Sequence, residues 1–332
     1  MNVPAARSTA GPSKAGTSAT RQPAVRQVRI DEDHAGQRLD NFLLGELKGV
    51  PKSRIYRIVR SGEVRVNSGR ADPQQRLNAG DLVRIPPVRV AERPVPTAPP
   101  GAFPIVYEDE ALLVIDKPVG VAVHGGSGVS FGVIEQLRAA RPQARLLELV
   151  HRIDRDTSGL LIVARKRSAL LALHEAMRRG RIGKRYIALV QGDWSGPPAV
   201  LRFPLHRYLT PEGERRVMVR DGGQEAGTRV RPLARLVHPK FGPLTLIQAD
   251  LETGRTHQIR VHLAHAGHRL LGDDKYGDFE LNKLLQQNGF KRMFLHALEV
   301  VFHHPVDGRE LRLKAPWPAE FERLKQACHA PI

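Results

Sequence analysis

The sequence of 332 residues predicts an α+β fold with two domains. Two observations point to this fold class. No segment is repeated, and helical and strand-like patterns follow one another without regular alternation, which favours a mixed, largely antiparallel central sheet flanked by helices and loops. A proline-rich stretch separates this larger domain from a small N-terminal α/β unit.

The chain is strongly basic. It holds 52 Lys and Arg residues against 34 Asp and Glu residues, which gives a net charge of +18. A polyanionic partner relieves the self-repulsion of such a protein, so nucleic acid is the expected partner, ahead of an anionic membrane. No apolar run approaches the roughly 20 residues that span a bilayer. The single cysteine, Cys328, forms no internal disulfide, and together with the lack of a signal peptide it indicates a cytoplasmic location.

Residues 1–26 are expected to form a disordered basic tail. They consist mainly of Ala, Ser, Thr, Gly, Pro and basic residues, which cannot bury enough apolar surface to fold. A mitochondrial transit peptide is the alternative, but the Pro and Gly content disfavours the amphipathic helix that it requires.

A compact unit is expected over residues 27–86. Apolar residues recur at helical spacing in its first half, and Pro51 should end this helix: Leu39, Phe42, Leu43 and Leu47. Ser53 should cap a second helix that buries Ile55, Ile58 and Val59. The other positions of that helix are basic, which favours a phosphate-binding face: Lys52, Arg54, Arg57 and Arg60. Two short strands are expected at 64–66 and 82–85.

This unit resembles the S4 RNA-binding domain. The similarity lies in four motifs: Gly36-Gln37-Arg38-Leu39-Asp40, Lys52-Ser53-Arg54-Ile55, Gly62-Glu63-Val64-Arg65-Val66-Asn67 and Gly80-Asp81. The resemblance implies that the unit binds RNA, and that Lys52, Arg54 and Arg57 contact phosphates without reading the bases.

Residues 87–104 should form a stiff linker, because they are rich in proline. The second domain is then expected at 105–328. Its elements, in order, should be a hairpin at 105–107 and 112–115 that the segment 116–120 breaks, a helix at 130–140, a buried strand at 160–164, a helix capped by Ser168, a strand at 184–190, several short strands within 199–250, a helix around 262–268 and a last apolar strand at 294–302.

A charged loop at 151–158 runs directly into the buried strand at 160–164, which is an arrangement that often positions catalytic groups. Within it, Asp154 has Arg152 and Arg155 as neighbours. A carboxylate beside guanidinium groups stays ionised, which suits a nucleophile or a base rather than a general acid. A structural ion pair is the alternative for any single Asp–Arg pair. Two further polar clusters, 184–186 and 255–260, favour the catalytic interpretation.

Several other catalytic patterns are missing from the sequence. The histidines of the last third lack the spacing of a zinc protease, so no metal site is expected. Neither a kinase glycine-rich loop nor a P-loop is present, and Ser158 lacks the first glycine of a nucleophile elbow. The sequence holds no cofactor motif, so no cofactor is expected. The polar groups of Asp156, Thr157 and Ser158 are assigned to the turn.

The second domain resembles the RluA-type pseudouridine synthases. The motifs that carry the similarity are Asp116-Lys117-Pro118-x-Gly120, His151-Arg152-Ile153-Asp154-Arg155-Asp156-Thr157-Ser158-Gly159, Lys184-x-Tyr186-x-Ala188-Leu189-Val190-x-Gly192, Thr253-Gly254-Arg255-Thr256-His257-Gln258-Ile259-Arg260-Val261-His262 and Phe294-Leu295-His296-Ala297. Three stretches, at 50–53, 84–91 and 123–135, are most similar to the members that modify several uridines of 23S ribosomal RNA.

The resemblance implies isomerisation of uridine to pseudouridine on a flipped-out base, and it assigns roles. Asp154 is the catalytic aspartate, as nucleophile or as base. Tyr186 stacks on the base and Arg260 pairs with the carboxylate. Arg152 fills the space that the base leaves, and the remaining expected contacts are Arg255 and His257 with the loop or the RNA backbone and Leu295 in the wall of the uracil pocket. The expected protein is a monomer that needs no cofactor and binds 23S ribosomal RNA or its assembly precursor.

Three alternatives remain at this stage. The same chemistry could act on other ribosomal or transfer RNA sites. A non-catalytic RNA-binding protein of ribosome assembly could use the same basic surfaces, although binding alone requires no carboxylate facing a polyanion. A metal-dependent nuclease could use His151, Asp154 and Asp156.

Overall fold

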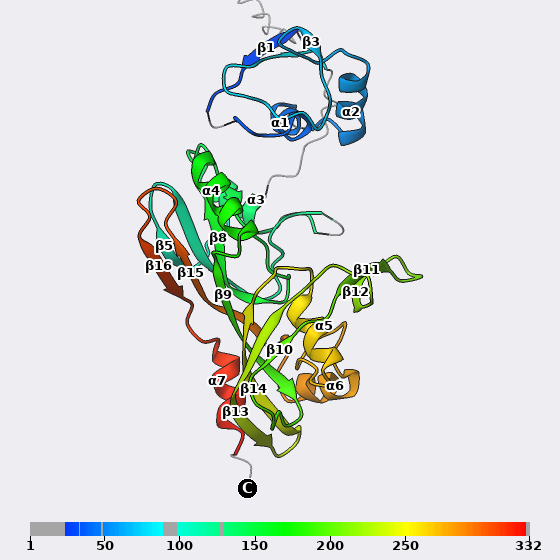
Figure 1. Cartoon of the computed structure of the whole chain (residues 1–332), viewed down its shortest axis with the longest axis vertical. Helices are drawn as coiled ribbons and strands as arrows, with labels where there is room; N and C mark the ends of the chain where they lie inside the picture. The colour runs from blue at the N-terminus through cyan, green and yellow to red at the C-terminus, as the bar shows by residue number, and fades with distance from the viewer. Residues whose placement is uncertain (1–23, 33, 48, 89–97, 127–128, 330–332) are drawn as a thin grey trace, which may run out of the picture. The chain divides into compact units, whose positions relative to one another are not determined.

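The chain divides into two compact units, one on each side of residue 95. The computed structural model describes residues 24–32, 34–47, 49–88, 98–126 and 129–329 (Figure 1). Most of the predicted tail, residues 1–23, lies outside the described residues, and so does the middle of the predicted linker, residues 89–97. The domain boundaries expected from the sequence stay predictions.

The N-terminal unit combines a small antiparallel sheet with two helices. Its strands follow the order β1-β4-β2-β3, and their bounds are Arg26–Arg29, Leu82–Ile85, Arg65–Val66 and Gly69–Arg70. The helices are α1, Leu39–Glu46, and α2, Lys52–Arg60. Their apolar faces pack with the sheet in one core that includes Leu39, Phe42, Leu43, Ile55, Ile58, Val59 and Val83. The expected pair of helices and the strand at 82–85 are therefore confirmed.

The expected cap of α2 is wrong. Pro51, not Ser53, is the N-cap residue, and its carbonyl accepts hydrogen bonds from the backbone N–H groups of Arg54 and Ile55 at 2.9 and 3.2 Å. Ser53 lies inside the first turn. Proline fixes φ near −65° and has no N–H to leave unpaired, so it starts a helix well. The basic residues of α2 that were expected to bind phosphate, Lys52, Arg54 and Arg57, are all exposed.

The second unit is built on a ten-stranded mixed sheet. Its main path is β10-β13-β14-β9-β15-β8-β6-β5, with β16 paired to β15 and β7 paired to β8. In chain order the strands are β5 Ile105–Glu108, β6 Leu112–Lys117, β7 Glu148–Leu149, β8 Ser158–Ala164, β9 Gly183–Gln191, β10 Ala199–Leu201, β13 Thr228–His238, β14 Gly242–Leu251, β15 Leu295–His303 and β16 Glu310–Lys314. Every pair is antiparallel except β8 with β15. The predicted mixed, largely antiparallel sheet is therefore confirmed.

Among its described residues, the second unit also contains five helices and one separate hairpin. The helices are α3 Val133–Ala140, α4 Arg167–Arg178, α5 Gln258–His265, α6 Phe279–Gln287 and α7 Ala319–Gln326, and the hairpin is formed by β11 Leu205–Leu209 and β12 Arg215–Val219. Figure 1 shows this hairpin projecting away from the sheet. Helices α6 and α7 and strands β7 and β16 were not expected from the sequence.

Several predicted boundaries are wrong. Ser168 lies inside α4, whose N-cap is Lys166. Helix α5 begins at Gln258, four residues before the expected start, and β6 continues through Lys117 instead of ending at 115. Strands β13 and β14 have 11 and 10 residues, so the region 199–250 holds two long strands besides its short ones.

The two faces of the sheet are covered by different helices. In β9, Tyr186 and Ala188 belong to an apolar cluster that includes residues of α3 and α5, whereas Ile187 and Leu189 belong to a cluster that includes residues of α6 and α7. This alternation follows from the two-residue period of a strand. A pocket lined by Tyr186 opens on the face of the sheet that carries this residue. No helix in the described part of the chain is long and apolar enough to cross a membrane.

Candidate active site

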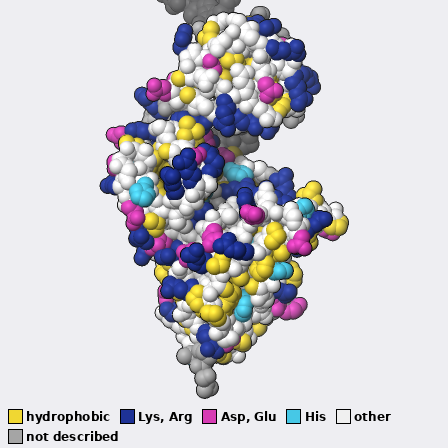
Figure 2. Space-filling model, viewed as in Figure 1, with side chains coloured by type: hydrophobic (Ala, Val, Ile, Leu, Met, Phe, Trp, Pro, Cys, Tyr) yellow, Lys and Arg dark blue, Asp and Glu magenta, His cyan; other side chains and the backbone are white. Residues whose placement is uncertain are grey.

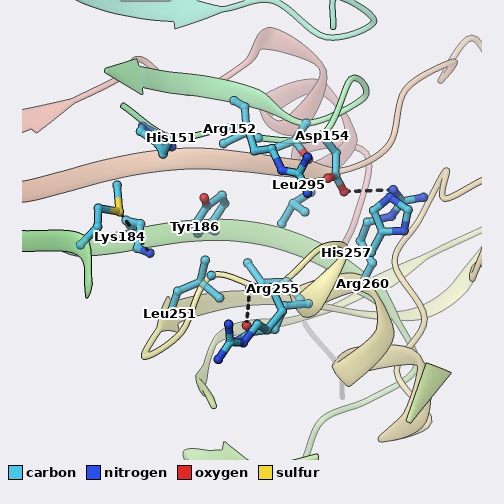
Figure 3. A pocket seen from close by; sticks show the side chains of 16 residues that line it. His151, Arg152, Asp154, Lys184, Tyr186, Leu251, Arg255, His257, Arg260 and Leu295 are labelled. Atoms are coloured by element: carbon cyan, nitrogen blue, oxygen red, sulfur yellow. Dashed lines mark hydrogen bonds and ion pairs between the residues drawn. The ribbon is translucent and has the colours of Figure 1, made fainter. Parts of the chain in front are cut away.

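A pocket of about 250 Å³ opens in the second unit and brings together segments that are far apart in the sequence (Figure 3). It is lined by His151, Arg152, Ile153, Asp154, Thr157, Met177, Lys184, Tyr186, Leu251, Gly254, Arg255, His257, Gln258, Ile259, Arg260 and Leu295. All seven site residues expected in this unit are among them. Lys52, Arg54 and Arg57 lie in the other unit, on α2.

The loop at 151–157 is fixed to the sheet at both ends. The strand that follows it, β8, is buried along its whole length. Gly159 in β8 has φ +107°, and a Cβ at this position would lie 2.3 Å from the carbonyl oxygen of Ala297 in β15. Only glycine allows so close an approach. Because Ser158 and Gly159 pair with His296 and Ala297, the end of the loop lies beside the start of β15, which supplies Leu295.

Lys117 anchors the loop through hydrogen bonds to backbone carbonyl groups. Its side chain is completely buried, and Nζ donates hydrogen bonds to the carbonyl oxygens of Pro118, Val121 and Arg155 at 2.8, 2.8 and 3.0 Å. One of the three carbonyls belongs to the residue after Asp154. The sequence singled out Lys117 only as part of a family motif, and its burial gives that motif a structural reason.

Asp154 and Arg260 form an ion pair inside the pocket, with 3.0 Å between Oδ2 and Nη1. The aspartate side chain is 26% exposed and that of the arginine only 3%. The carboxylate therefore faces the pocket while its partner is fixed beneath it. Figure 3 shows the two side chains pointing toward each other from the loop and from α5.

Arg260 is held in turn by Asp273. Nε and Nη2 donate to the two carboxylate oxygens of Asp273, both at 2.7 Å, and Nη2 also reaches Asp274 at 3.3 Å. Burial alone would lower the pKa of Arg260, but the hydrogen bonds and charges of Asp273 and Asp154 raise it. Burial alone would raise the pKa of Asp273, yet Arg260 and the N–H groups of Lys275 and Tyr276 hold it below its ordinary value. Both groups stay charged.

Asp273 was not expected as a site residue. In the sequence it is one of two adjacent acids after Leu270-Leu271-Gly272, a pattern that is equally typical of a solvated turn. The turn is as constrained as the loop at 151–157. Gly272 has φ +71°, and a Cβ there would lie 1.9 Å from the carbonyl oxygen of Arg292. Asn282 of α6 accepts from the N–H of Gly272 and donates to the carbonyl of Asp273, at 2.8 and 2.7 Å.

Tyr186 forms part of the pocket floor. It lies in β9 and is 6% exposed, so one surface of the ring remains available to the pocket. Burial, with a smaller contribution from the charge of Asp154, raises the pKa of its phenol. The hydroxyl therefore stays protonated at neutral pH.

His257 is positioned by a hydrogen-bonded chain. It is the N-cap residue of α5 and has φ +53°. Tyr276 Oη accepts from the N–H of Val217 in β12 at 2.9 Å and is hydrogen-bonded to His257 Nδ1 at 2.8 Å. Burial and the charge of Arg260 lower the pKa of His257, against the opposite effect of Asp154. The imidazole is therefore neutral, which the sequence did not indicate.

Arg152 and Arg255 are exposed at the mouth of the pocket. Arg152 Nη2 donates to Thr256 Oγ1 at 3.0 Å, and Arg255 Nε donates to the carbonyl oxygen of Glu225 at 3.0 Å. A second pocket of about 750 Å³ shares Arg152 and Asp154 with the first and is rich in cations: Arg155, Arg207, Arg215, Arg216 and Lys275. Figure 2 shows Lys and Arg side chains on the surface of both units.

His151 has a structural role. Its Nε2 accepts a hydrogen bond from the backbone N–H of Ile162 at 3.1 Å. Burial and the charge of Lys184 lower its pKa to about 3. This geometry disfavours the metal-dependent nuclease, which would need His151 as a ligand. The part of the chain that the structure describes contains no group of three or more His, Cys, Asp or Glu side chains that could hold a metal ion.

Comparisons with known proteins agree on both units. The family described as RNA pseudouridylate synthase matches residues 111–265, and the S4 domain matches residues 37–83. Ribosomal large subunit pseudouridine synthase C of Pasteurella multocida is 51% identical over 308 residues, which cover 91% of this chain and 93% of that protein. The protein of the same name from Escherichia coli strain K12 is 50% identical over 316 residues, which cover 92% and 98%.

Solved structures show the same fold. Human RNA Pseudouridylate Synthase Domain Containing 1 superimposes with a TM-score of 0.58 at 24% identity, over 71% of this chain and 93% of that one. Human RNA Pseudouridylate Synthase Domain Containing 4 gives 0.54 at 23% identity, over 69% and 95%.

Proposed function

The chain belongs to the RluA-type family of pseudouridine synthases, and from this premise we propose that it converts several uridines of 23S ribosomal RNA to pseudouridine. The names of the relatives in Pasteurella multocida and Escherichia coli, which share about half of their residues with this chain, support a large-subunit RNA substrate. The net charge of +18 and the S4 domain suit the same partner.

The reaction breaks the bond between ribose C1′ and uracil N1, turns the base and joins C1′ to C5. No atom is imported. The proton on C5 leaves, and N1 gains a proton. The uridine must first leave its stack to reach a pocket of this size.

The observation that carries the proposal is the ion pair between Asp154 and Arg260 at 3.0 Å in a pocket that Tyr186 also lines. As nucleophile or as base at the ribose, Asp154 must be ionised when RNA displaces water from the pocket. A carboxylate that loses its water tends to take up a proton. Arg260 supplies a counter-charge and a hydrogen bond to this carboxylate in place of water, and Asp273 keeps Arg260 in position.

The remaining roles are those that the family resemblance implies, and the positions of the residues in the pocket support them. Tyr186 stacks on the uracil with its phenol protonated, and Leu295, which is 3% exposed, forms an apolar wall beside it. Arg152 and Arg255 at the mouth contact the RNA backbone, and Arg152 fills the space that the flipped base leaves. His257, as a neutral group, orders the start of α5. The protein acts as a monomer in the cytoplasm.

The test uses 23S ribosomal RNA transcribed with 5-tritiated uridine. The wild-type chain should release tritium, and mapping of pseudouridine should give several discrete positions. Asp154→Asn keeps the shape of the side chain and should lower the rate by at least about 10³-fold with little change in RNA affinity, because it removes a reacting group. Tritium release by Asp154→Asn near the wild-type rate would contradict the role of Asp154, and release from transfer RNA alone would contradict the substrate.

A further inference from the structure

Lys184 is a basic residue of the pocket that lies at the end opposite Arg260, away from the exposed arginines at the mouth. In β9, Lys184 and Tyr186 are two residues apart and both line the pocket. Arg185, between them, points to the other face, where it bonds to Asp250 and Glu299 at 2.9 Å each. Figure 3 shows Lys184 and Tyr186 next to each other along β9, with Asp154 and Arg260 at the far end.

Lys184 is surrounded by groups that do not neutralise it. Its Nζ lies 4.0 Å from Met177 Sδ, and a Cβ added to Gly254 would lie 3.4 Å from it. The nearby imidazole of His151 is neutral. Within the described ranges, no carboxylate oxygen lies within ion-pair distance of Lys184 Nζ. Burial lowers the pKa of this amine, and no acid opposes the effect.

This situation differs from that of Arg260, which has two carboxylates. A half-buried cation without a counter-charge costs folding free energy. This cost in folding free energy is explained if the bound substrate supplies a hydrogen-bond acceptor for the Lys184 ammonium. The charge would then be satisfied only in the complex, as expected for a group that acts during the reaction.

We propose that the Lys184 ammonium donates a hydrogen bond to a carbonyl oxygen of the flipped uracil and stabilises the negative charge that the base acquires when the C1′–N1 bond breaks. The inference rests on the proposed function and deepens it. Residues two apart in a strand are about 6.6 Å apart at Cα. A pyrimidine stacked on Tyr186, with its ribose toward Asp154, therefore extends its far edge toward Lys184.

The charges balance in this scheme. When the bond breaks, its electron pair stays on N1, and the resulting uracil anion is delocalised onto O2 and O4. Lys184 keeps its proton throughout and supplies only a hydrogen bond from a preorganised cation. When C5 bonds to C1′, the base becomes neutral. The proton that C5 then loses is matched by the proton that N1 gains, so the product base is also neutral.

A contact with an RNA phosphate is the competing role. Phosphates stay outside a pocket that admits one base, and the exposed Arg152 and Arg255 already stand at its mouth. Lys184 is less exposed than either of them. The two roles differ in what they change: a phosphate contact contributes to affinity, whereas a contact with the departing base contributes to the rate.

The experiment compares Lys184→Met with Lys184→Arg in the full-length chain. Single-turnover tritium release is measured at saturating 23S transcript, and the RNA dissociation constant is measured at several salt concentrations. Lys184→Met should lower the maximal rate by about 10²-fold and change the dissociation constant less than threefold. Lys184→Arg, which keeps the charge, should have a maximal rate at least about tenfold higher than that of Lys184→Met. Lys283→Met, the same change on the exposed face of α6, should match the wild type.

Three outcomes would overturn the proposal. Lys184→Met could keep the wild-type maximal rate. It could instead weaken RNA binding and reduce the salt dependence while the maximal rate stays unchanged, which would assign Lys184 to a phosphate. Equal rates for the methionine and arginine variants would show that the charge is not what matters. Lys184→Gln serves the same comparison if methionine unfolds the chain. Tritium release by the wild type tests the proposed function independently of all three.

Discussion

At the residue scale, the pocket combines the partly exposed carboxylate of Asp154 with buried charges that hold it in position. The sequence indicated Asp154, because a charged loop followed by an apolar run is conspicuous in any chain. It indicated Tyr186 and Arg260 only through a family resemblance. Asp273 was missed because an acid in a polar turn has no local mark that separates it from a solvated one. Its importance comes from Arg260, 13 residues earlier and fully buried.

Asp273→Asn should lower both stability and activity. The change leaves Arg260 buried with only part of its counter-charge, which typically costs about 3–5 kcal/mol of unfolding free energy. It also loosens the partner of Asp154, so tritium release should fall by at least about tenfold. Denaturant unfolding and single-turnover release measure the two effects. Asp274→Asn is the matched control: its side chain is 61% exposed, and the expected cost is below about 1 kcal/mol. Equal costs for the two variants would refute the assignment.

His151 should make the protein less stable in acid. Its folded-state pKa is about 3 against an ordinary value of 6.5, because the ring is largely buried and its Nε2 accepts a hydrogen bond. Between these two pH values the unfolded chain binds a proton that the folded chain does not, so stability falls as pH drops from 6.5 toward 3. The slope is at most about 1.4 kcal/mol per pH unit.

His151→Gln keeps an acceptor for Ile162 and should remove this part of the pH dependence. His303→Gln, at an exposed position, should leave it unchanged. The measurement is the unfolding free energy of the three proteins between pH 4 and 7. Parallel curves for the wild type and His151→Gln would show that His151 titrates normally.

At the scale of elements, the strands that form the pocket were easier to predict than the helices around it. The segments at 160–164, 184–190 and 294–302 are rich in apolar and β-branched residues, and they coincide with β8, β9 and β15 apart from Phe294, which precedes β15. Strand β16 was missed because Glu310-Leu311-Arg312-Leu313-Lys314 alternates with charges at a sheet edge. The start of helix α5 was predicted too late in the sequence because Gln258 and Arg260 look like surface residues. Both are buried, and tertiary hydrogen bonds satisfy their polar groups.

Gly159→Ala should disrupt the contact between β8 and β15. The new methyl would meet the carbonyl oxygen of Ala297 at 2.3 Å and also require φ +107° from an alanine. We expect a loss above about 3 kcal/mol, combined from overpacking and backbone strain. Gly213→Ala separates the two causes, because its φ is +79° and nothing lies within 4 Å of the added Cβ. It should cost only about 1–2 kcal/mol. Thermal or denaturant unfolding gives both values, and similar losses would exclude the steric explanation.

At the scale of the whole molecule, the two units should contribute to different measurable quantities, the N-terminal unit to RNA affinity and the second unit to the reaction rate. The basic face of α2 should add affinity for RNA without affecting the chemistry. Replacing Lys52, Arg54 and Arg57 by Ala should weaken binding and reduce the slope of log affinity against log salt by about 2–3, because up to three phosphate contacts are lost. The maximal rate of tritium release at saturating RNA should not change.

The control for this triple variant is Lys240→Ala combined with Lys283→Ala and Lys291→Ala. These three cations are exposed on the second unit and line neither of its two pockets. The salt dependence should then stay close to that of the wild type. An unchanged slope in the α2 variant would exclude this helix as an RNA-binding surface.

Because β8 pairs with β15, the pocket can form only after the chain has been synthesised as far as β15. The two strands are linked by a buried hydrogen bond between Ser158 and His296, 138 positions apart. During translation the S4 domain leaves the ribosomal exit tunnel first, and Leu295 is among the last pocket residues to leave it. A truncated or stalled product therefore carries the RNA-binding unit without a closed pocket. Such a fragment would compete with finished molecules for the same RNA while modifying none of it.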